Sequence, residues 1–398
     1  MWLPLLRSRT NPMPRTSTGG RRERGPRQRY RPCSEQLEGR ALLSTFTVTN
    51  TNNSGAGSLR AAIVAVNKDT VNQVDVISFK IPGTGTHTIK LTSALPIVTH
   101  PVNLNGSSEA GIVLDGSNIL GGGDGLVLDA RNYAHAFSGA VQGLKLTGFA
   151  DAIQVNDSGS STPLSVQLLK NVVSLSSGGD GIQVFAGTGS NQASVSNNTV
   201  TVGVAGDAIV ASTGGTSTNY IFSNNQITAN GGGDGIFTNG TGASNSLTYS
   251  GNTIKTTGGG DALSLFVSNS SPTAATVLNN VLNTGGLATG LILSGGAHFQ
   301  AKVQGNNFGG NLVGVSVTGD GTTAGVVDLG GGSLGSTGGN DFRSYKTATA
   351  DSYAIGLFQV GSGYSMSALD NHFSVTPTSV IADRHHDTAA GGSGNILV

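Results

Sequence analysis

Short runs of alternating apolar and polar residues follow one another along most of the chain, separated by turns rich in Gly, Asn and Ser. Alternation with a period of two is typical of half-buried β-strands. In NTVTVGVAGDAIV, residues 198–210, two such runs flank a turn of small residues. The same order returns in NQITANGGGDGIF and NTIKTTGGGDALS. The pattern therefore predicts many short strands arranged in a repeat.

The repeat has a stride of 27 residues over the middle of the chain. Six asparagines mark it: Asn171, Asn198, Asn225, Asn252, Asn279 and Asn306. An apolar residue stands two places after each: Val173, Val200, Ile227, Ile254, Val281 and Phe308. Three strands of this length cannot bury a core alone, whereas stacked units share one. A fixed stride in this range predicts a solenoid.

We predict an all-β fold, a right-handed parallel β-helix with three short strands in each coil of about 27 residues. Strands of successive coils would pair in parallel about 4.8 Å apart, so that like residues stack in columns. The hand follows from the strong preference of parallel crossovers for right-handed connections. The Asn column is predicted to form a structural ladder at one corner, because Asn tolerates left-handed backbone geometry and its amide can bond the turn. The Gly-rich turn before each Asp is predicted to form a second corner, where Gly adopts positive φ without strain.

Composition divides the chain into three parts. Residues 1–45 are rich in Arg, Pro, Gly and Ser, and they are predicted to form a disordered basic segment for export or targeting. Residues 46–375 form the predicted β-helix, whose N-terminal cap spans 46–80. Residues 376–398 are predicted to be an irregular tail.

The predicted cap contains the one helical pattern that stands out. In SLRAAIVAVN, Leu59, Ile63 and Val66 fall on one helical face. This face is predicted to cover the first coil, whose strand edges would otherwise be unpaired. The chain has no run of 18 apolar residues, so no transmembrane segment is predicted.

The formal net charge of zero hides an asymmetry between the first 40 residues and the rest. Ten Arg and three Glu give residues 1–40 a balance of +7, and the remaining 12 basic and 19 acidic residues give −7. A mildly acidic body repels anionic polymers, so we predict no nucleic-acid binding by the β-helix. Its Ser-, Thr- and Asn-rich surface favours polysaccharide or cell-envelope components as partners.

A column of aspartates is the main candidate for chemistry: Asp180, Asp207, Asp234 and Asp261. Stacked carboxylates would lie about 5 Å apart in adjacent coils and about 10 Å apart in alternate coils. These separations bracket those of glycosidase carboxylate pairs, and close like charges can recruit a cation such as Ca²⁺. The structural alternative is that each Asp accepts backbone N–H bonds within its own Gly-rich turn.

Aromatic and basic residues bear on this choice. Phe185, Phe237 and Phe266 fall near the end of the strand after an Asp, where an exposed ring can stack on a sugar. Between residues 150 and 340 the basic side chains are Lys170, Lys255, His298 and Lys302. An enzyme acting on uronates needs cations to hold its substrate, so this scarcity favours a structural or carbohydrate-binding role without a cofactor. The alternative is a polysaccharide lyase or glycoside hydrolase that uses the Asp column, with or without Ca²⁺.

Several segments resemble one family. TFTVTNTNNSGAGSLRAAI (45–63), DVISFKI and TIKLTSALPIVTHPVNLNGSSEAG (88–111) look like the N-terminal module of large secreted parallel β-helix proteins of planctomycete-type bacteria. QLEGRALLS resembles the short motif that precedes their extracellular part, although Gly39 stands where that motif usually has an acidic residue or Pro. The resemblance implies export to the cell surface or medium, and it implies no particular reaction.

Overall fold

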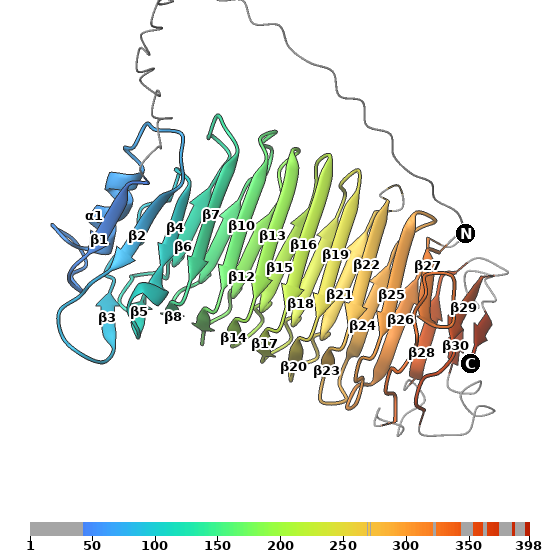
Figure 1. Ribbon diagram of the computed structural model, residues 1–398. Coiled ribbons are helices and arrows are strands. Elements are labelled where there is room, and N and C mark those ends of the chain that lie inside the picture. Colours follow the sequence, from blue (N-terminus) through green and yellow to red (C-terminus); the bar gives the residue numbers. More distant parts are fainter. Residues whose placement is uncertain are drawn as a thin grey trace, which may run out of the picture. The chain divides into compact units, whose positions relative to one another are not determined.

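The computed structural model describes residues 43–268, 270, 272–320, 324–343, 353–360, 364–373, 384–386 and 395–398. The chain divides into two units, Met1–Ala41 and Leu42–Val398, and all described residues belong to the second. The predicted basic segment therefore lies outside the described residues, apart from its last three positions. The second unit is a right-handed parallel β-helix of about 12 turns, as the repeat predicts (Figure 1).

The central coils each contribute one strand to each of three parallel sheets, which we call A, B and C, and the coils at the two ends lack strands in one or two of them. Sheet A has the strand order β1 (Thr45–Val48), β2 (Asp75–Phe79), β4 (Val102–Asn105), β7 (Phe137–Gln142), β10 (Leu164–Leu169), β13 (Ser190–Ser196), β16 (Ser217–Ser223), β19 (Asn245–Ser250), β22 (Thr273–Leu278), β25 (Phe299–Gln304), β27 (Val326–Gly330), β29 (Ser365–Ala368) and β31 (Asn395–Leu397). Sheet B consists of β3 (His87–Lys90), β5 (Ile112–Asp115), β8 (Lys145–Thr147), β11 (Val172–Ser174), β14 (Thr199–Val202), β17 (Gln226–Ala229), β20 (Thr253–Thr256) and β23 (Val281–Asn283). Sheet C consists of β6 (Leu126–Asp129), β9 (Ile153–Asn156), β12 (Ile182–Phe185), β15 (Ile209–Thr213), β18 (Ile236–Gly240), β21 (Leu263–Val267), β24 (Thr289–Ser294), β26 (Val313–Thr318), β28 (Tyr353–Phe358) and β30 (Arg384–His386).

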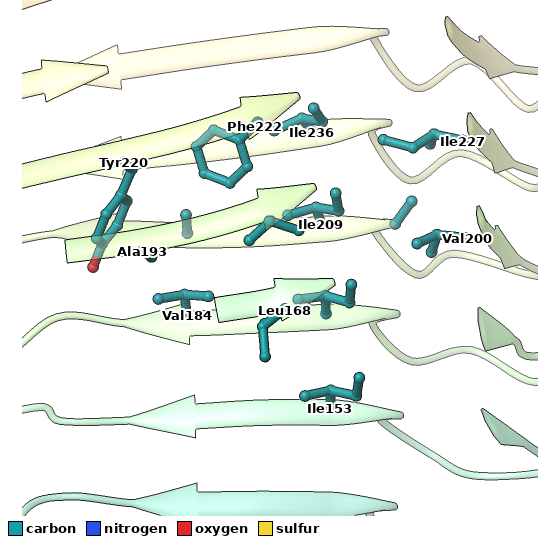
Figure 2. Packing of buried hydrophobic residues seen from close by; sticks show 14 of the residues in the cluster. Ile153, Leu168, Val184, Ala193, Val200, Ile209, Tyr220, Phe222, Ile227 and Ile236 are labelled. Atoms are coloured by element: carbon teal, nitrogen blue, oxygen red, sulfur yellow. The ribbon is translucent and has the colours of Figure 1, made fainter. Parts of the chain in front are cut away.

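Columns of apolar side chains fill the space between the three sheets. In sheet C, Ile153, Ile182, Ile209, Ile236 and Leu263 are paired in register from coil to coil, and all are buried (Figure 2). Their neighbours along each strand point outward, which is the two-residue alternation seen in the sequence. Each coil therefore buries its apolar face only because the next coil covers it.

The helix α1 (Leu59–Val66) packs against β1 and β2 at the first coil (Figure 1). Ser58 caps it, because its hydroxyl accepts the backbone N–H of Ala61 at 3.2 Å. Leu59, Ile63 and Val66 are fully buried, which confirms the predicted face. A short 3-10 helix, η1 (Gly106–Ser108), follows β4. The cap thus covers the edge where the β-helix begins.

An asparagine ladder runs along the corner between sheets A and B. Each buried Asn donates its backbone N–H and its Nδ2–H to the Oδ1 of the next Asn, at 2.9–3.2 Å. Its members are Asn171, Asn198, Asn225, Asn252, Asn280, Asn306, Asn340 and Asn371. The prediction of Asn279 is wrong, because one extra residue between β19 and β22 shifts the register to Asn280. For the same reason Leu282, and not Val281, joins the apolar column.

The left-handed backbone at this corner belongs to the residue before each ladder Asn. Lys170, Asn197, Asn224 and Asn279 have φ between 54° and 57°, and Gly251 has φ 65°. The ladder Asn itself contributes its amide and is not the left-handed residue. The predicted role of Asn in the turn is therefore split between two neighbouring positions.

The Gly directly before Asp207 and the Gly directly before Asp234 are required by close backbone approach. A Cβ on Gly206 would lie 1.8 Å from the carbonyl oxygen of Gly179 in the preceding coil, and a Cβ on Gly233 would lie 2.0 Å from Gly206 O. Neither of these residues has positive φ, which occurs instead at Gly231, Gly232 and Gly259. Only Gly lets successive coils approach this closely at the corner between sheets B and C.

Two strands fall within the predicted C-terminal tail. β30 pairs with β28 in sheet C, and β31 pairs with β29 in sheet A. The prediction of an irregular tail is therefore wrong for these residues, because they continue the parallel sheets. The other tail positions, apart from Val398, lie outside the described residues.

Candidate functional site

The four predicted aspartates stack along the corner between sheets B and C. The Oδ1 of each carboxylate accepts the backbone N–H of the Asp in the next coil: Asp180 from Asp207 at 2.9 Å, Asp207 from Asp234 at 2.6 Å, and Asp234 from Asp261 at 2.8 Å. Asp151 extends this Asp ladder, because its Oδ1 accepts the N–H of Asp180 at 2.7 Å. The structural alternative predicted that each carboxylate accepts a backbone N–H of its own turn. The structure shows instead that it accepts a backbone N–H of the following coil.

Thr289 ends the Asp ladder by donating its backbone N–H to Asp261 Oδ1 at 2.7 Å. The sequence analysis missed Asp151, which lies 29 residues before Asp180 and so breaks the stride. A signal for it existed, because Asp151 opens the same Asp-Ala-Ile triplet as Asp207.

Burial sets the acidity of the Asp ladder. Desolvation raises the pKa of Asp207 and of Asp261 to about 6, although each carboxylate accepts a backbone N–H that lowers its pKa. Desolvation also raises the pKa of Asp234 and of Asp151. A carboxyl group with a pKa near neutral can act as a general acid or base. The Asp ladder therefore has an acidity suited to proton transfer at its central and C-terminal positions.

The Gln183 side chain donates hydrogen bonds to the first two members of the Asp ladder, which distinguishes them from the members in later coils. Its Nε2 donates to Asp180 Oδ2 at 2.8 Å and to Asp151 Oδ2 at 3.1 Å. Val210 and Phe237 occupy the same register position in the next two coils, and neither side chain has a hydrogen-bond donor. This column therefore changes from an amide to two apolar side chains, and it becomes polar again at Ser264, whose hydroxyl lowers the pKa of Asp234.

Two of the three predicted aromatic residues come together on the outer face of sheet C. The ring centroids of Phe237 and Phe266 lie 5.8 Å apart with a tilt of 37°, and Phe266 is 38% exposed. Phe185 lies three coils away from Phe266 in the same register column and does not join the pair. Phe237 follows Asp234 by three residues, so this aromatic pair borders the Asp ladder.

Cationic partners for the Asp ladder are not observed in the described part of the chain. The ion pairs found between described residues join His87 to Glu109, His100 to Asp75, Arg131 to Asp129, and Arg343 to Asp341. Among the same residues, no three His, Cys, Asp or Glu side chains are grouped so that they could hold a metal ion. The carboxylates of the Asp ladder are therefore held by backbone N–H groups and by Gln183.

A second candidate surface is a shallow groove on the outer face of sheet A. A hollow of about 410 Å³ crosses β2, β4, β7 and β10, and a smaller one of about 100 Å³ crosses β10, β13 and β16. Both include Ser165 and Gln167, so the two hollows form one run along the axis of the β-helix, which we call the amide groove. Sequence reasoning did not find it, because a groove depends on the relative heights of side chains from several coils.

The side chains of the amide groove are uncharged. Amides come from Asn103, Asn105, Gln142, Gln167, Gln192 and Asn219, and the remaining lining consists of Ser, Gly, Ala, Val and Ile. Gln142 Nε2 donates to Asn105 Oδ1 at 2.8 Å, which fixes both amides. Such a surface offers donors and acceptors together, as sugar hydroxyl groups require.

Comparisons with known proteins add no family to this description. The chain matches no protein-family model and no curated protein. No helix among the described residues has the length and apolar character needed to cross a membrane. The fold and the two ladders define the class of this protein as a parallel β-helix.

Proposed function

We propose that the protein is an exported β-helix that acts at the cell surface or in the medium, with a structural or adhesive role based on binding neutral carbohydrate. The amide groove carries this proposal. It spans consecutive coils of sheet A and presents amides and hydroxyl groups without a charged side chain. The resemblance of the N-terminal module to secreted β-helix proteins supports the location.

The direction of the amide groove favours an extended chain over a compact ligand. Ala140, Gln167, Ser194 and Ile221 stand in one register column, so each coil repeats the same outward position about 4.8 Å further on. A linear glycan lying along the axis would meet an equivalent position at every coil. Many weak contacts of this kind add up along one chain, which suits adhesion.

Glycan binding tests the proposal directly. The full-length protein should bind neutral polysaccharides on an array in preference to uronate-containing ones. Gln167→Ala, at the junction of the two hollows, should weaken this binding about tenfold, the equivalent of one hydrogen bond. Gln226→Ala is the matched control, because Gln226 is an exposed amide on sheet B. Equal binding by both variants, or a preference for anionic glycans, would contradict the proposal.

A purely structural role in an envelope layer is a simpler form of the same proposal. It predicts that the protein binds no glycan on the array but remains attached to cells after washing. In that case the Gln167→Ala variant and the native protein should be retained on cells to the same extent.

The second candidate function is a polysaccharide lyase or glycoside hydrolase that uses the Asp ladder. The raised pKa of Asp207 and Asp261 favours it, together with the bordering Phe237–Phe266 pair. Carboxylates two coils apart are separated by about 10 Å, close to the upper limit for an inverting glycosidase. Against it stand the backbone bonds that already occupy one oxygen of each carboxylate, and the lack of a nearby cation in the described residues.

A turnover screen against neutral and acidic polysaccharides separates the two functions. An enzyme would lose at least 100-fold in rate in Asp207→Asn or Asp261→Asn, because Asn keeps the acceptor oxygen and loses the acid. Asp180→Asn is the control, since Gln183 holds that carboxylate. Cleavage of any polymer that depends on Asp207 or Asp261 would replace the binding role with catalysis.

A further inference from the structure

Three buried polar side chains lie inside the corner between sheets C and A. Asp157 and Tyr220 are fully buried, and Asn191 is 1% exposed. In the described part of the chain, neither oxygen of Asp157 accepts a hydrogen bond of normal geometry. The same is true of Asn191 Oδ1 and the Tyr220 hydroxyl. Buried polar atoms are normally bonded, so these oxygens require a partner that is not a protein group.

Two of these side chains meet beside Gly187. Asn191 Nδ2 donates to the carbonyl groups of Gly187, Gly189 and Gly214 at 3.1–3.3 Å, which turns its Oδ1 the opposite way. A Cβ on Gly187 would lie within 2.5 Å of Asp157 O, Asp157 Oδ2 and Ser160 O, so three oxygens converge beside this residue.

Tyr220 completes the arrangement from the next coil. Its ring is directed from β16 toward β13, where it lies beside Ala193, the small residue with which it is in register (Figure 2). Burial raises the pKa of Tyr220, and the charge of Asp157 raises it further, so the two groups lie within electrostatic range of each other. The hydroxyl group therefore reaches toward the space that Ala193 leaves.

Charge decides what kind of partner fits this space. A buried carboxylate is costly unless an opposite charge or several donors stabilise it. Asp157 forms no ion pair among the described residues, and Ser160 and Gly187 only partly offset the effect of its burial. Every unpartnered atom of the set is an oxygen, and hard cations bind through oxygen ligands from carboxylate, amide and hydroxyl groups.

A hollow on the surface lies directly outside this corner. It has a volume of about 320 Å³ and is lined by Gly187, Thr213 and Gly214 among others. Gly187 thus lines the surface hollow and also borders Asp157 Oδ2, so the hollow lies next to the buried carboxylate.

We propose that Asp157, Asn191 and Tyr220 form a buried binding site for a hard cation held by oxygen ligands. The site is separate from the Asp ladder and from the amide groove, and it does not depend on carbohydrate binding. A cation here links three successive coils, because its ligands come from the coils of β9, β13 and β16. Its role is to stabilise the corner that has no ladder of its own.

The test uses the full-length protein stripped with EDTA and then dialysed against Ca²⁺, Mg²⁺, Na⁺ or K⁺, with choline as the ionic-strength control. One of these cations should bind at about one ion per chain and raise the melting temperature by about 4 °C at 100 times its Kd. Asp157→Asn keeps the shape and should abolish both effects. Asp328→Asn is the matched control, because Asp328 is equally buried but its oxygens accept four backbone N–H bonds. It should lower the melting temperature and leave the cation effect intact.

If Asp157→Asn does not fold, the Tyr220→Phe variant provides a second test of the cation site. It removes only the hydroxyl group and should weaken cation binding at least threefold. The proposal is wrong if no cation changes the melting temperature, or if the cation effect survives in both Asp157→Asn and Tyr220→Phe. An Asp157→Asn protein that is more stable than the native one in every buffer would show that a proton, and not a cation, neutralises this carboxyl group.

Discussion

Asn280 Oδ1 accepts both the backbone N–H and the Nδ2–H of Asn252, each at 2.9 Å. Asn280 in turn donates to Asn306 Oδ1 and to the carbonyl oxygen of Tyr249. A single buried asparagine therefore satisfies hydrogen-bonding groups in the coil before its own and in the coil after it. Removing such an amide leaves several polar groups unpaired in the interior, and each unpaired group costs about 1–3 kcal/mol.

Asn280→Ala should accordingly lower the free energy of unfolding by about 3–5 kcal/mol, measured by urea denaturation. Asn279→Gly is the control, because Asn279 is exposed and has φ 54°, a conformation that Gly adopts without strain. We expect Asn279→Gly to change stability by less than about 0.5 kcal/mol. Equal losses in the two variants would mean that the ladder does not pass through Asn280.

Substitutions at two adjacent residues in the turn before Asp207 should change the stability of the protein in opposite directions. Gly206→Ala forces a Cβ to within 1.8 Å of Gly179 O, so we expect a loss of about 3 kcal/mol or more. Ala205 has φ 62°, and Ala205→Gly should gain up to about 1 kcal/mol by relieving this left-handed conformation. Thermal unfolding of the two variants measures both changes. A shift in the same direction for both would contradict the close approach of the coils.

The Asp ladder should make the protein more stable at mildly acidic pH. The folded-state pKa of Asp207 and Asp261 is about 6, against 3.8 for an unperturbed Asp, so the folded state binds more protons between these values. Stability from these groups is therefore fully present below about pH 4, falls as pH rises toward about 6, and is lost above that.

Comparison with a double variant isolates this contribution from that of other carboxyl groups. Asp207→Asn/Asp261→Asn keeps both acceptor oxygens and removes both charges. After allowance for partial solvent exposure, it should exceed the native protein in stability by about 1–2 kcal/mol at pH 7.5. This difference should shrink at pH 4.5. A difference that stays constant over the whole range would rule out raised pKa values in the Asp ladder.

Removing the hydroxyl group should affect the stability of the protein differently at the two buried tyrosines, Tyr249 and Tyr220. Tyr249 donates to Thr238 Oγ1 at 2.9 Å, so Tyr249→Phe should cost about 1 kcal/mol. In cation-free buffer, Tyr220→Phe should cost nothing or stabilise the protein, since the Tyr220 hydroxyl has no hydrogen-bond partner in the described part of the chain. Differential scanning calorimetry of both variants after EDTA treatment provides the comparison. A loss in Tyr220→Phe as large as that in Tyr249→Phe would indicate a partner for Tyr220.

The fold was predictable because one physical requirement recurs in every coil. Asn198, Asn225 and Asn252 keep a constant stride, and a buried amide column needs the same residue type at each level. The prediction failed where two asparagines are adjacent, at Asn279 and Asn280. Sequence alone does not choose between them, because an extra turn residue shifts the register and only the stacking of coils decides which side chain points inward.

The candidate sites were less predictable, because they depend on contacts between coils. The stacking of the Asp column could be predicted, but its bonds to the following coil could not, because local turn chemistry favours a bond within the same turn. Asp157 precedes a Ser- and Gly-rich turn like many surface aspartates, and nothing in its neighbourhood marks it as buried. Its environment is created by Gly187 and Tyr220, which come from later coils.

All amides of the Asn ladder point the same way. Each Oδ1 faces the preceding coil and each Nδ2 faces the following one, so their dipoles add along the axis and polarise one another. The column therefore has a partial negative end near Asn171 and a partial positive end near Asn371. If two copies of this protein ever stack end to end, this polarity favours a head-to-tail arrangement, which propagates as a filament instead of closing as a symmetric dimer.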